Sequence, residues 1–203
     1  MKTFEISARR RTAIELGCAL GLVLTLALTL MAGQAYRTAC AAVCRDTLRL
    51  HILANSDTVE DQLLKFKVRD AVLAAMPDLL PATENKAQAV AAVQKALPAL
   101  QMTAQGALRT AHSDLPVQLR LETYDFPPKD YGDFALPGGA YTALRIELGA
   151  AAGHNWFCVL YPGLCVSASA PRYETPAENA IVFGKYEVRF ALVDLVKGLR
   201  DVV

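Results

Sequence analysis

The sequence has almost no excess of charge of either sign. Lys and Arg number 21 against 20 Asp and Glu, which leaves a formal net charge of +1. Domains that bind nucleic acid usually carry a basic patch or stripe. We therefore expect no nucleic-acid partner.

Several common catalytic and cofactor motifs are also missing. The chain has no phosphate-binding glycine loop, no GxSxG elbow and no HExxH pair, and each of these motifs places a specific chemistry on a turn or helix. No internal repeat or coiled-coil pattern is present either. We expect a protein without a cofactor or a resident metal, and one that is not an enzyme.

The N-terminus contains a long uncharged run. Arg9, Arg10 and Arg11 precede the apolar segment Leu16–Gly33, and a positive flank before such a segment is typical of a signal peptide or signal anchor. The run is close to the ~20 residues that span a bilayer. The positive-inside bias keeps the arginines in the cytoplasm and exports the rest. A small-x-small cleavage site ends at Ala35, and its use stays open.

These observations predict three segments. Residues 1–35 form a basic stub and a signal or anchor segment, residues 36–47 form a juxtamembrane spacer, and residues 48–203 form one exported domain. The length of the last segment suits a single domain with its own core.

The strands are predicted from alternating apolar residues. "LRLHIL" alternates over Leu48–Leu53 and predicts a strand with one buried face. Further strands are expected over Val117–Phe126, 140–149 and 155–167, the last segment as a strand, a tight Pro-Gly turn and a short return. The segment 168–179 reads as a loop, and the last segment, 181–199, fits a strand that passes into a helix.

Two helices are expected between the first and second strands. One follows residue 57 and ends at Pro77. The other begins near Thr83, which is its expected N-cap. Pro98 should kink the second helix or split it. The order of elements predicts one α+β domain with helices packed on a mostly antiparallel sheet.

The polar junction between the first strand and the first helix has two interpretations. Asp57 and Glu60 have capping-box spacing, and Ser56 and Thr58 are also capping types. An anion site at the helix N-terminus is the functional alternative. Such sites usually contain glycine, which is absent here, so we favour the cap.

The segment "GHNWFCVLYPGLC" leaves four alternatives open. An exported domain permits a disulfide between Cys158 and Cys165, although a two-residue Pro-Gly hairpin would place them on a diagonal that is long for a bridge. Cys158 with His154 could form a catalytic pair. His154 with both cysteines could bind a metal, and the cysteines could simply be buried. We favour the disulfide or the core over catalysis or a metal.

Three blocks in this order resemble the stage II sporulation protein R family of endospore-forming bacteria. They are "RLHILANSDTVEDQLLKFKVRDAV", "YGDFALPGGAYTALRIELG" and "GHNWFCVLYPGLC". The signature positions that the resemblance marks are Asn55, Ser56, Asp57, Asp61, Arg69, Asp70, His154, Asn155 and Trp156.

The resemblance implies an intercellular signal. Family members are made in the forespore and are exported across or anchored in its membrane, facing the space between the forespore and the mother cell. There they activate a membrane-embedded aspartic protease of the mother-cell septal membrane, which processes the mother-cell pro-sigma factor. The alternative is a cell-envelope cysteine hydrolase that uses Cys158 and His154.

A ligand activates a receptor by binding its active state better than its inactive state. The candidate receptor contacts are Lys65 and Arg69 on the first predicted helix, and Tyr131 and Phe134 in the turn-rich segment 127–139, which we call the aromatic loop. For Tyr131 and Phe134 the alternative is that they cover the core.

Overall fold

A computed structural model of the chain describes residues 8–79, 83–163, 173 and 175–184. The helices and strands follow one another in this order: α1 (Ala8–Asp46), β1 (Leu48–Leu53), α2 (Val59–Leu79), α3 (Lys86–Thr110), β2 (Val117–Phe126), β3 (Lys129–Asp130), β4 (Ala135–Leu136), β5 (Gly139–Leu148), β6 (Asn155–Tyr161) and α4 (Pro176–Phe183).

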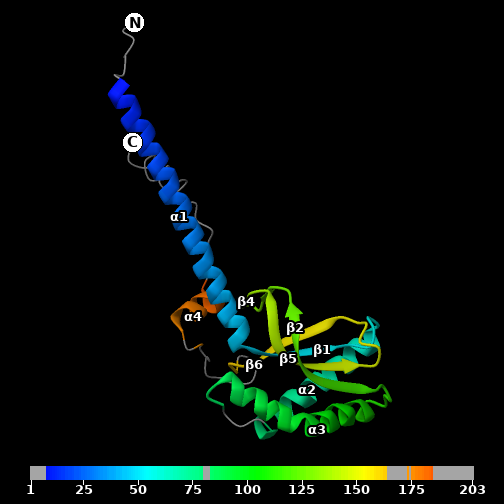
Figure 1. The fold of residues 1–203 in the computed structure, drawn as a ribbon. Coiled ribbons are helices and arrows are strands. Elements are labelled where there is room, and N and C mark those ends of the chain that lie inside the picture. Colours follow the sequence, from blue (N-terminus) through cyan, green and yellow to red (C-terminus); the bar gives the residue numbers. More distant parts are fainter. Residues whose placement is uncertain (1–7, 80–82, 164–172, 174, 185–203) are drawn as a thin grey trace.

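A four-stranded sheet in the order β2-β5-β1-β6 organises the domain (Figure 1). β1 pairs parallel with β5, whereas β1 with β6 and β2 with β5 are antiparallel. Helices α2 and α3 cover one face of this sheet. The predicted α+β fold, with helices packed on a mostly antiparallel sheet and an apolar helix before it, is confirmed.

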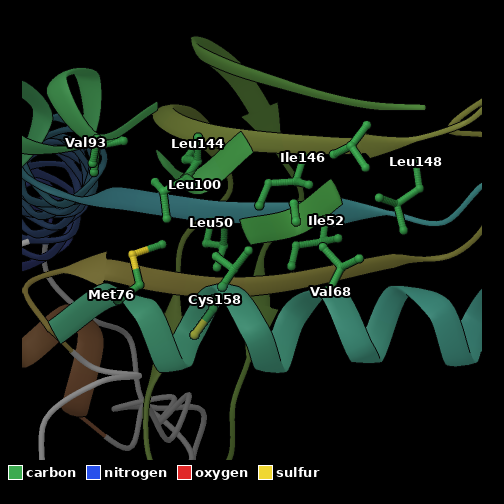
Figure 2. Packing of buried hydrophobic residues seen from close by; sticks show 14 of the residues in the cluster. Leu50, Ile52, Val68, Met76, Val93, Leu100, Leu144, Ile146, Leu148 and Cys158 are labelled. Carbon is green, nitrogen blue, oxygen red and sulfur yellow. The ribbon is translucent and has the colours of Figure 1, made fainter. Parts of the chain in front are cut away.

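The main core lies between the sheet and these two helices (Figure 2). Leu50 of β1, Leu144 of β5 and Leu100 of α3 are all 0% exposed. Val68 and Met76 contribute the apolar stripe of α2. Burying a side chain of this size stabilises the fold by roughly 1.5–3 kcal/mol. The packed core therefore holds the sheet and the two helices in place, and with them the loops at the ends of the strands.

The central strand β1 is buried on both faces, and the prediction of one buried face is wrong. Leu50 and Ile52 face the helices, while Arg49 and His51 are also 0% exposed. Phe126, Tyr141 and Phe157 surround these two polar side chains on the opposite face. The alternation predicts that this second face is exposed to solvent, but aromatic side chains from other strands cover it.

Helix α1 extends well past the apolar run. It continues to Asp46, and Val43 in its last turns is 0% exposed in a second apolar cluster with Val159 and Val182. The predicted spacer is therefore helical for most of its length, and its end belongs to the folded domain. Of the helices in the described residues, this one is long and apolar enough to cross a membrane, a composition that signal sequences share.

Two predicted helix boundaries are wrong, and of the two outcomes predicted for Pro98 the split does not occur, whereas a kink stays a prediction. Helix α2 continues two residues beyond Pro77, and α3 is capped by Asn85 rather than Thr83. Helix α3 is not split at Pro98, which lies inside it on an exposed position. Water can bind the carbonyl group that loses its helical partner there, so the proline is tolerated.

Helix α4 occupies part of the segment predicted as a loop. Thr175 caps it, and Glu178 completes a capping box with Pro176 at the start of the helix. The short helix packs its Ile181 and Val182 against the end of α1. Cys165 and most of the predicted C-terminal strand and helix lie outside the described residues, so those predictions stay predictions.

The cap of α3 supplies a first test. The Asn85 side chain accepts a hydrogen bond from the backbone N–H of Gln88 at 2.9 Å. Asn85→Ala should lower the free energy of unfolding by about 1 kcal/mol, because the helix N-terminus loses this partner. Urea unfolding measures the change, with Glu84→Ala as the neighbouring control. Equal midpoints for the two variants would show that the cap contributes nothing.

Candidate functional site

The polar junction after β1 is positioned by helix α2. Thr58 caps this helix: its hydroxyl accepts from the Asp61 N–H at 3.3 Å, and its carbonyl accepts from the Gln62 N–H at 3.0 Å. The prediction of Asp57 as the cap is therefore wrong by one residue. The Asp57 carboxylate is free to face another part of the chain.

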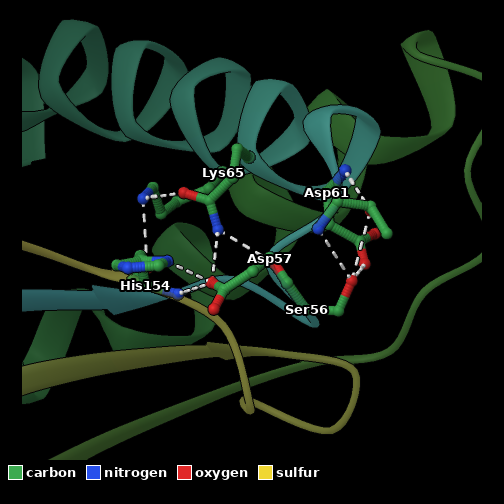
Figure 3. A network of polar contacts seen from close by, with 7 residues as sticks. Ser56, Asp57, Asp61, Lys65 and His154 are labelled. Atoms are coloured by element: carbon green, nitrogen blue, oxygen red, sulfur yellow. Dashed lines mark hydrogen bonds and ion pairs between the residues drawn. The ribbon is translucent and has the colours of Figure 1, made fainter.

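Asp57 binds the loop that precedes β6 (Figure 3). Its carboxylate accepts from the His154 backbone N–H at 2.6 Å and pairs with Nδ1 of the His154 ring. Gln62 donates to the same oxygen at 3.4 Å. Residues separated by 97 positions in the sequence are joined here, so Asp57 connects two loops instead of capping a helix.

Asp61 and Asn55 hold the same junction from the other side. The Asp61 carboxylate accepts from Asn55 Nδ2 at 2.8 Å and from the Ser56 hydroxyl. The Ser56 and Asn55 hydrogen bonds, in that order, lower the pKa of Asp61 below its usual value. Asn55 Oδ1 in turn accepts from the Ala150 N–H at 2.9 Å. These contacts tie the start of α2 to the loop after β5.

Backbone hydrogen bonds complete the connection. The Ala152 N–H donates to the Asn55 carbonyl at 3.1 Å, and the Gly153 N–H donates to the Ala54 carbonyl at 2.9 Å. We name the whole arrangement the clasp, and it consists of Asn55, Ser56, Asp57, Asp61 and His154. The clasp brings together five of the signature positions, which lie in two separate blocks of the sequence.

The clasp is also exposed. The side chains of His154 and Asp57 are 76% and 55% exposed. Ser56 Oγ donates to Asp61 and not to the histidine. The clasp therefore presents a histidine and a carboxylate on a fixed backbone, which suits recognition of a partner more than nucleophilic catalysis.

Lys65 lies beneath the clasp and is only 2% exposed. Its Nζ donates to Gln62 Oε1 at 2.6 Å and to the His154 carbonyl at 3.0 Å. Burial lowers the pKa of this ammonium. The expectation that Lys65 lies on the exposed face of the helix is wrong, because its buried ammonium donates to Gln62 and to the His154 carbonyl of the clasp.

The role of Lys65 can be tested by stability. Lys65→Ala should lower the free energy of unfolding by about 2 kcal/mol, because the His154 carbonyl and Gln62 lose a charged donor. Thermal or urea unfolding measures the loss, and Lys67→Ala, at an exposed position of the same helix, is the matched control. A Lys65→Ala variant as stable as this control would contradict the assignment.

Arg69 keeps a partly exposed position next to the clasp. Its guanidinium lies 4.7 Å from the Phe66 ring centroid and 5.5 Å from that of Trp156. Its Nε pairs with Asp70 at 2.7 Å, and the Arg69 side chain is 28% exposed. Stacking holds the side chain in one place, so this candidate contact is available to a partner.

The aromatic loop is turned mostly inward. The Tyr131 hydroxyl accepts from Arg49 Nη2 at 2.7 Å, and the Tyr131 and Phe134 rings stack with centroids 4.6 Å apart. Both rings pack against the cluster that holds the end of α1. Their packing favours the interpretation that they cover the core, and a receptor contact there stays a prediction.

The hypothesis of a catalytic Cys158–His154 pair gains no support from the geometry. Cys158 is 3% exposed and lies among the core residues between β6 and α2 (Figure 2). His154 lies outside the strand and pairs with Asp57. Within the described residues, no three His, Cys, Asp or Glu side chains gather as a metal site. The Cys158–Cys165 disulfide stays a prediction.

The sequence reasoning missed a polar layer on the sheet face opposite α2 and α3. His51 Nε2 bonds Asn155 Oδ1 at 2.9 Å, and Arg145 pairs with Glu122 at 2.6 Å and with Glu147 at 2.7 Å. The sequence contained part of the signal, because His51, Arg145 and Glu147 each stand between two apolar residues on their strands. Only the order of the strands shows that they meet.

Together the fold and the clasp define a class: an α+β domain attached to an apolar helix, in which an exposed polar cluster fixes two loops. The family described as stage II sporulation protein R matches residues 44–170, more than half of the chain. The chain belongs to the stage II sporulation protein R family, and this membership supports a role in sporulation signalling.

One relative is informative. The stage II sporulation protein R of Bacillus subtilis (strain 168) is 35% identical over 118 residues, which cover 58% of this chain. The matched part spans about half of that relative, 53% of its length. No solved structure matches the chain significantly.

Proposed function

We propose that this chain is an exported intercellular signal that activates a membrane-embedded aspartic protease, which then processes the mother-cell pro-sigma factor. The observation that carries the proposal is the clasp. Signature positions of a sporulation signalling family form an exposed and ordered surface cluster, and not a catalytic set. The apolar helix α1 with its arginine flank supports export or anchoring in the forespore membrane.

We place the receptor contact on the clasp and the adjacent end of α2. Asp57 and His154 offer an acceptor and a ring on a fixed backbone, and Arg69 offers a stacked guanidinium. Arginine and aromatic side chains dominate the energy of many protein interfaces. Binding there activates the protease if its active state fits this surface better than its inactive state does.

The direct experiment adds a purified fragment, residues 37–203, to membranes that contain the protease and its pro-sigma substrate. This fragment keeps the last turns of α1, whose Val43 is part of the folded domain. Cleavage of the substrate supports the proposal. A folded fragment that leaves the substrate intact, together with an inactive full chain in a facing membrane, would overturn it.

The contact surface has its own test. Arg69→Ala should lower protease activation about tenfold, because an anchored arginine at an interface commonly contributes more than 1 kcal/mol. The dose–response of substrate cleavage measures this loss. Lys67→Ala on the same helix is the control, and both variants are checked for an unchanged melting temperature. Equal activation by the two variants would remove Arg69 from the contact.

One substitution distinguishes the hydrolase alternative from the signalling proposal. Cys158→Ser removes the only nucleophile that the alternative names, and signalling that persists in the folded variant excludes it. We expect signalling to persist, since Cys158 lies in the core.

A further inference from the structure

Strand β2 forms one outer edge of the sheet. All ten of its residues pair with β5, and among the described residues β2 has no second neighbouring strand. An edge strand presents a row of backbone N–H and C=O groups that can pair with another strand. The question is what pairs with this one.

Beyond Val117, whose carbonyl already accepts from Gln101 Nε2 of α3 at 2.5 Å, the edge lacks most of the features that prevent pairing. "VQLRLETYDF" contains neither proline nor lysine, and its register with β5 runs from Val117 to Phe126 without a shift. Natural edges of this length commonly carry a bulge, a proline or an inward-pointing charge. The β2 edge is therefore regular enough to accept a further strand.

The side chains of β2 separate onto the two faces of the sheet. Leu119 and Leu121 pack against the main core beside α3. Arg120, Glu122 and Tyr124 alternate with them, and Glu122 and Tyr124 contact Arg145 on the opposite face. An incoming strand would therefore meet leucines on one face and charges on the other.

The charges on that face are unevenly compensated. Glu122 and Glu147 share the single guanidinium of Arg145, which leaves one negative charge in excess. Arg120 donates to Gln118 Oε1 at 2.8 Å, and no carboxylate of the described residues pairs with it. One strand thus carries an uncompensated cation two positions from an acidic cluster.

We propose that β2 pairs antiparallel with β2 of a second copy of this chain, about a twofold axis at Leu121. This register places Arg120 of each copy opposite Glu122 of the other, and it places the two Leu121 residues opposite each other. Opposite charges at directly facing positions stabilise strand pairing, and a twofold interface forms each such pair twice. The two sheets join into one sheet of eight strands.

The direction of α1 agrees with this arrangement. Helices α2 and α3 lie on one face of the sheet, and α1 departs on the other side (Figure 1). The twofold axis between two antiparallel strands is perpendicular to their sheet. Both copies of α1 therefore leave the joined sheet on the same side, as two helices in one membrane require.

The test is the mass of the full chain in detergent micelles, measured by sedimentation over a range of concentrations. The wild-type chain should be dimeric. R120E and E122R should each weaken association about tenfold, since both symmetric pairs become repulsive. R109E, which reverses an exposed charge near the end of α3, should have no effect.

Mixing the two variants makes the test specific. The R120E chain carries two carboxylates at the paired positions and the E122R chain carries two guanidinium groups, so an equimolar mixture should recover the dimer. Hydrogen exchange of the wild-type β2 amides gives a measurement that needs no variant. Outward-facing amides should be protected at high concentration and lose protection on dilution.

Three results would overturn the proposal. They are a monomeric wild-type chain with fast exchange along β2, a dimer that R120E weakens no more than R109E does, and a monomeric chain whose R120E variant fails to activate the protease. The last result would assign the edge to the receptor. Mass and exchange do not involve the protease, so this inference and the proposed function can fail separately.

Discussion

Gly153→Ala should destabilise the domain by about 3 kcal/mol and loosen the clasp. A Cβ atom at this position would lie 2.2 Å from the carbonyl oxygen of Ser56. That oxygen accepts from Gln62 Nε2 at 2.9 Å, and the Gly153 N–H is itself bonded to Ala54. Neither backbone can move without breaking these hydrogen bonds, so the added methyl group acts as overpacking in a fixed site.

Urea unfolding of the purified domain measures this loss. Gly106→Ala is the matched control, because nothing lies within 4 Å of the Cβ that it would add inside α3. Alanine in a helix interior is better than glycine by up to about 1 kcal/mol, so the control should gain stability. If Gly153→Ala leaves the midpoint unchanged or raises it as Gly106→Ala does, the close approach at Gly153 is not a constraint.

The second large effect is a loss of stability in mild acid that depends on His51. This side chain is 0% exposed, and burial is the main cause that lowers its pKa to about 4. The nearby Arg145 and Arg49 guanidinium groups lower the pKa further, while the Asn155 hydrogen bond and Glu122 oppose the shift. The native state therefore holds His51 neutral, with Nε2 bonded to Asn155.

The sign of the pH dependence follows from the pKa of His51 in the unfolded and native states. In the unfolded chain His51 has its ordinary pKa near 6.5 and binds a proton below that pH, whereas the native state resists protonation until about pH 4. The stability that His51 contributes is thus complete above pH 6.5 and is lost as the pH falls to 4. The full loss is about 3 kcal/mol, at 1.36 kcal/mol per pKa unit.

The free energy of unfolding should be measured at intervals from pH 7.5 to 4 for the wild type and for His51→Gln. Glutamine can donate to Asn155 but does not titrate, so the variant should show a flatter profile over this window. Stability that falls with pH equally in both proteins would assign the effect to other groups. Asp61 is one such group, since its lowered pKa adds a loss at lower pH.

The sheet could be predicted from the sequence because its strands alternate, and the ten residues of β2 and of β5 match that pattern. The burial of the β1 face that carries Arg49 and His51 could not be predicted in this way. Arg49 and His51 read as solvent-facing because of their charge and polarity. Rings of Phe126, Tyr141 and Phe157, from three other strands or their ends, lie within 5.6 Å of the Arg49 guanidinium.

The resemblance marked the five residues of the clasp as signature positions, but the sequence did not predict their contacts. Local physics treats Asp57 and Thr58 as nearly equivalent caps. The choice between them depends on His154, which is distant in the sequence and offers Asp57 a better partner. Lys65 was misplaced for the same reason: its acceptors lie on that distant loop, and a helical pattern alone places a lysine in solvent.

The length of α1 sets where the domain can act. This helix has 39 residues, about 58 Å at 1.5 Å per residue, of which the apolar run takes about half. The stretch from Gln34 to Asp46 continues roughly 20 Å beyond the hydrocarbon and enters β1 after one residue. If α1 spans a bilayer and stays uncut, the domain stands at a fixed height above that bilayer, and any partner has to meet it at that height.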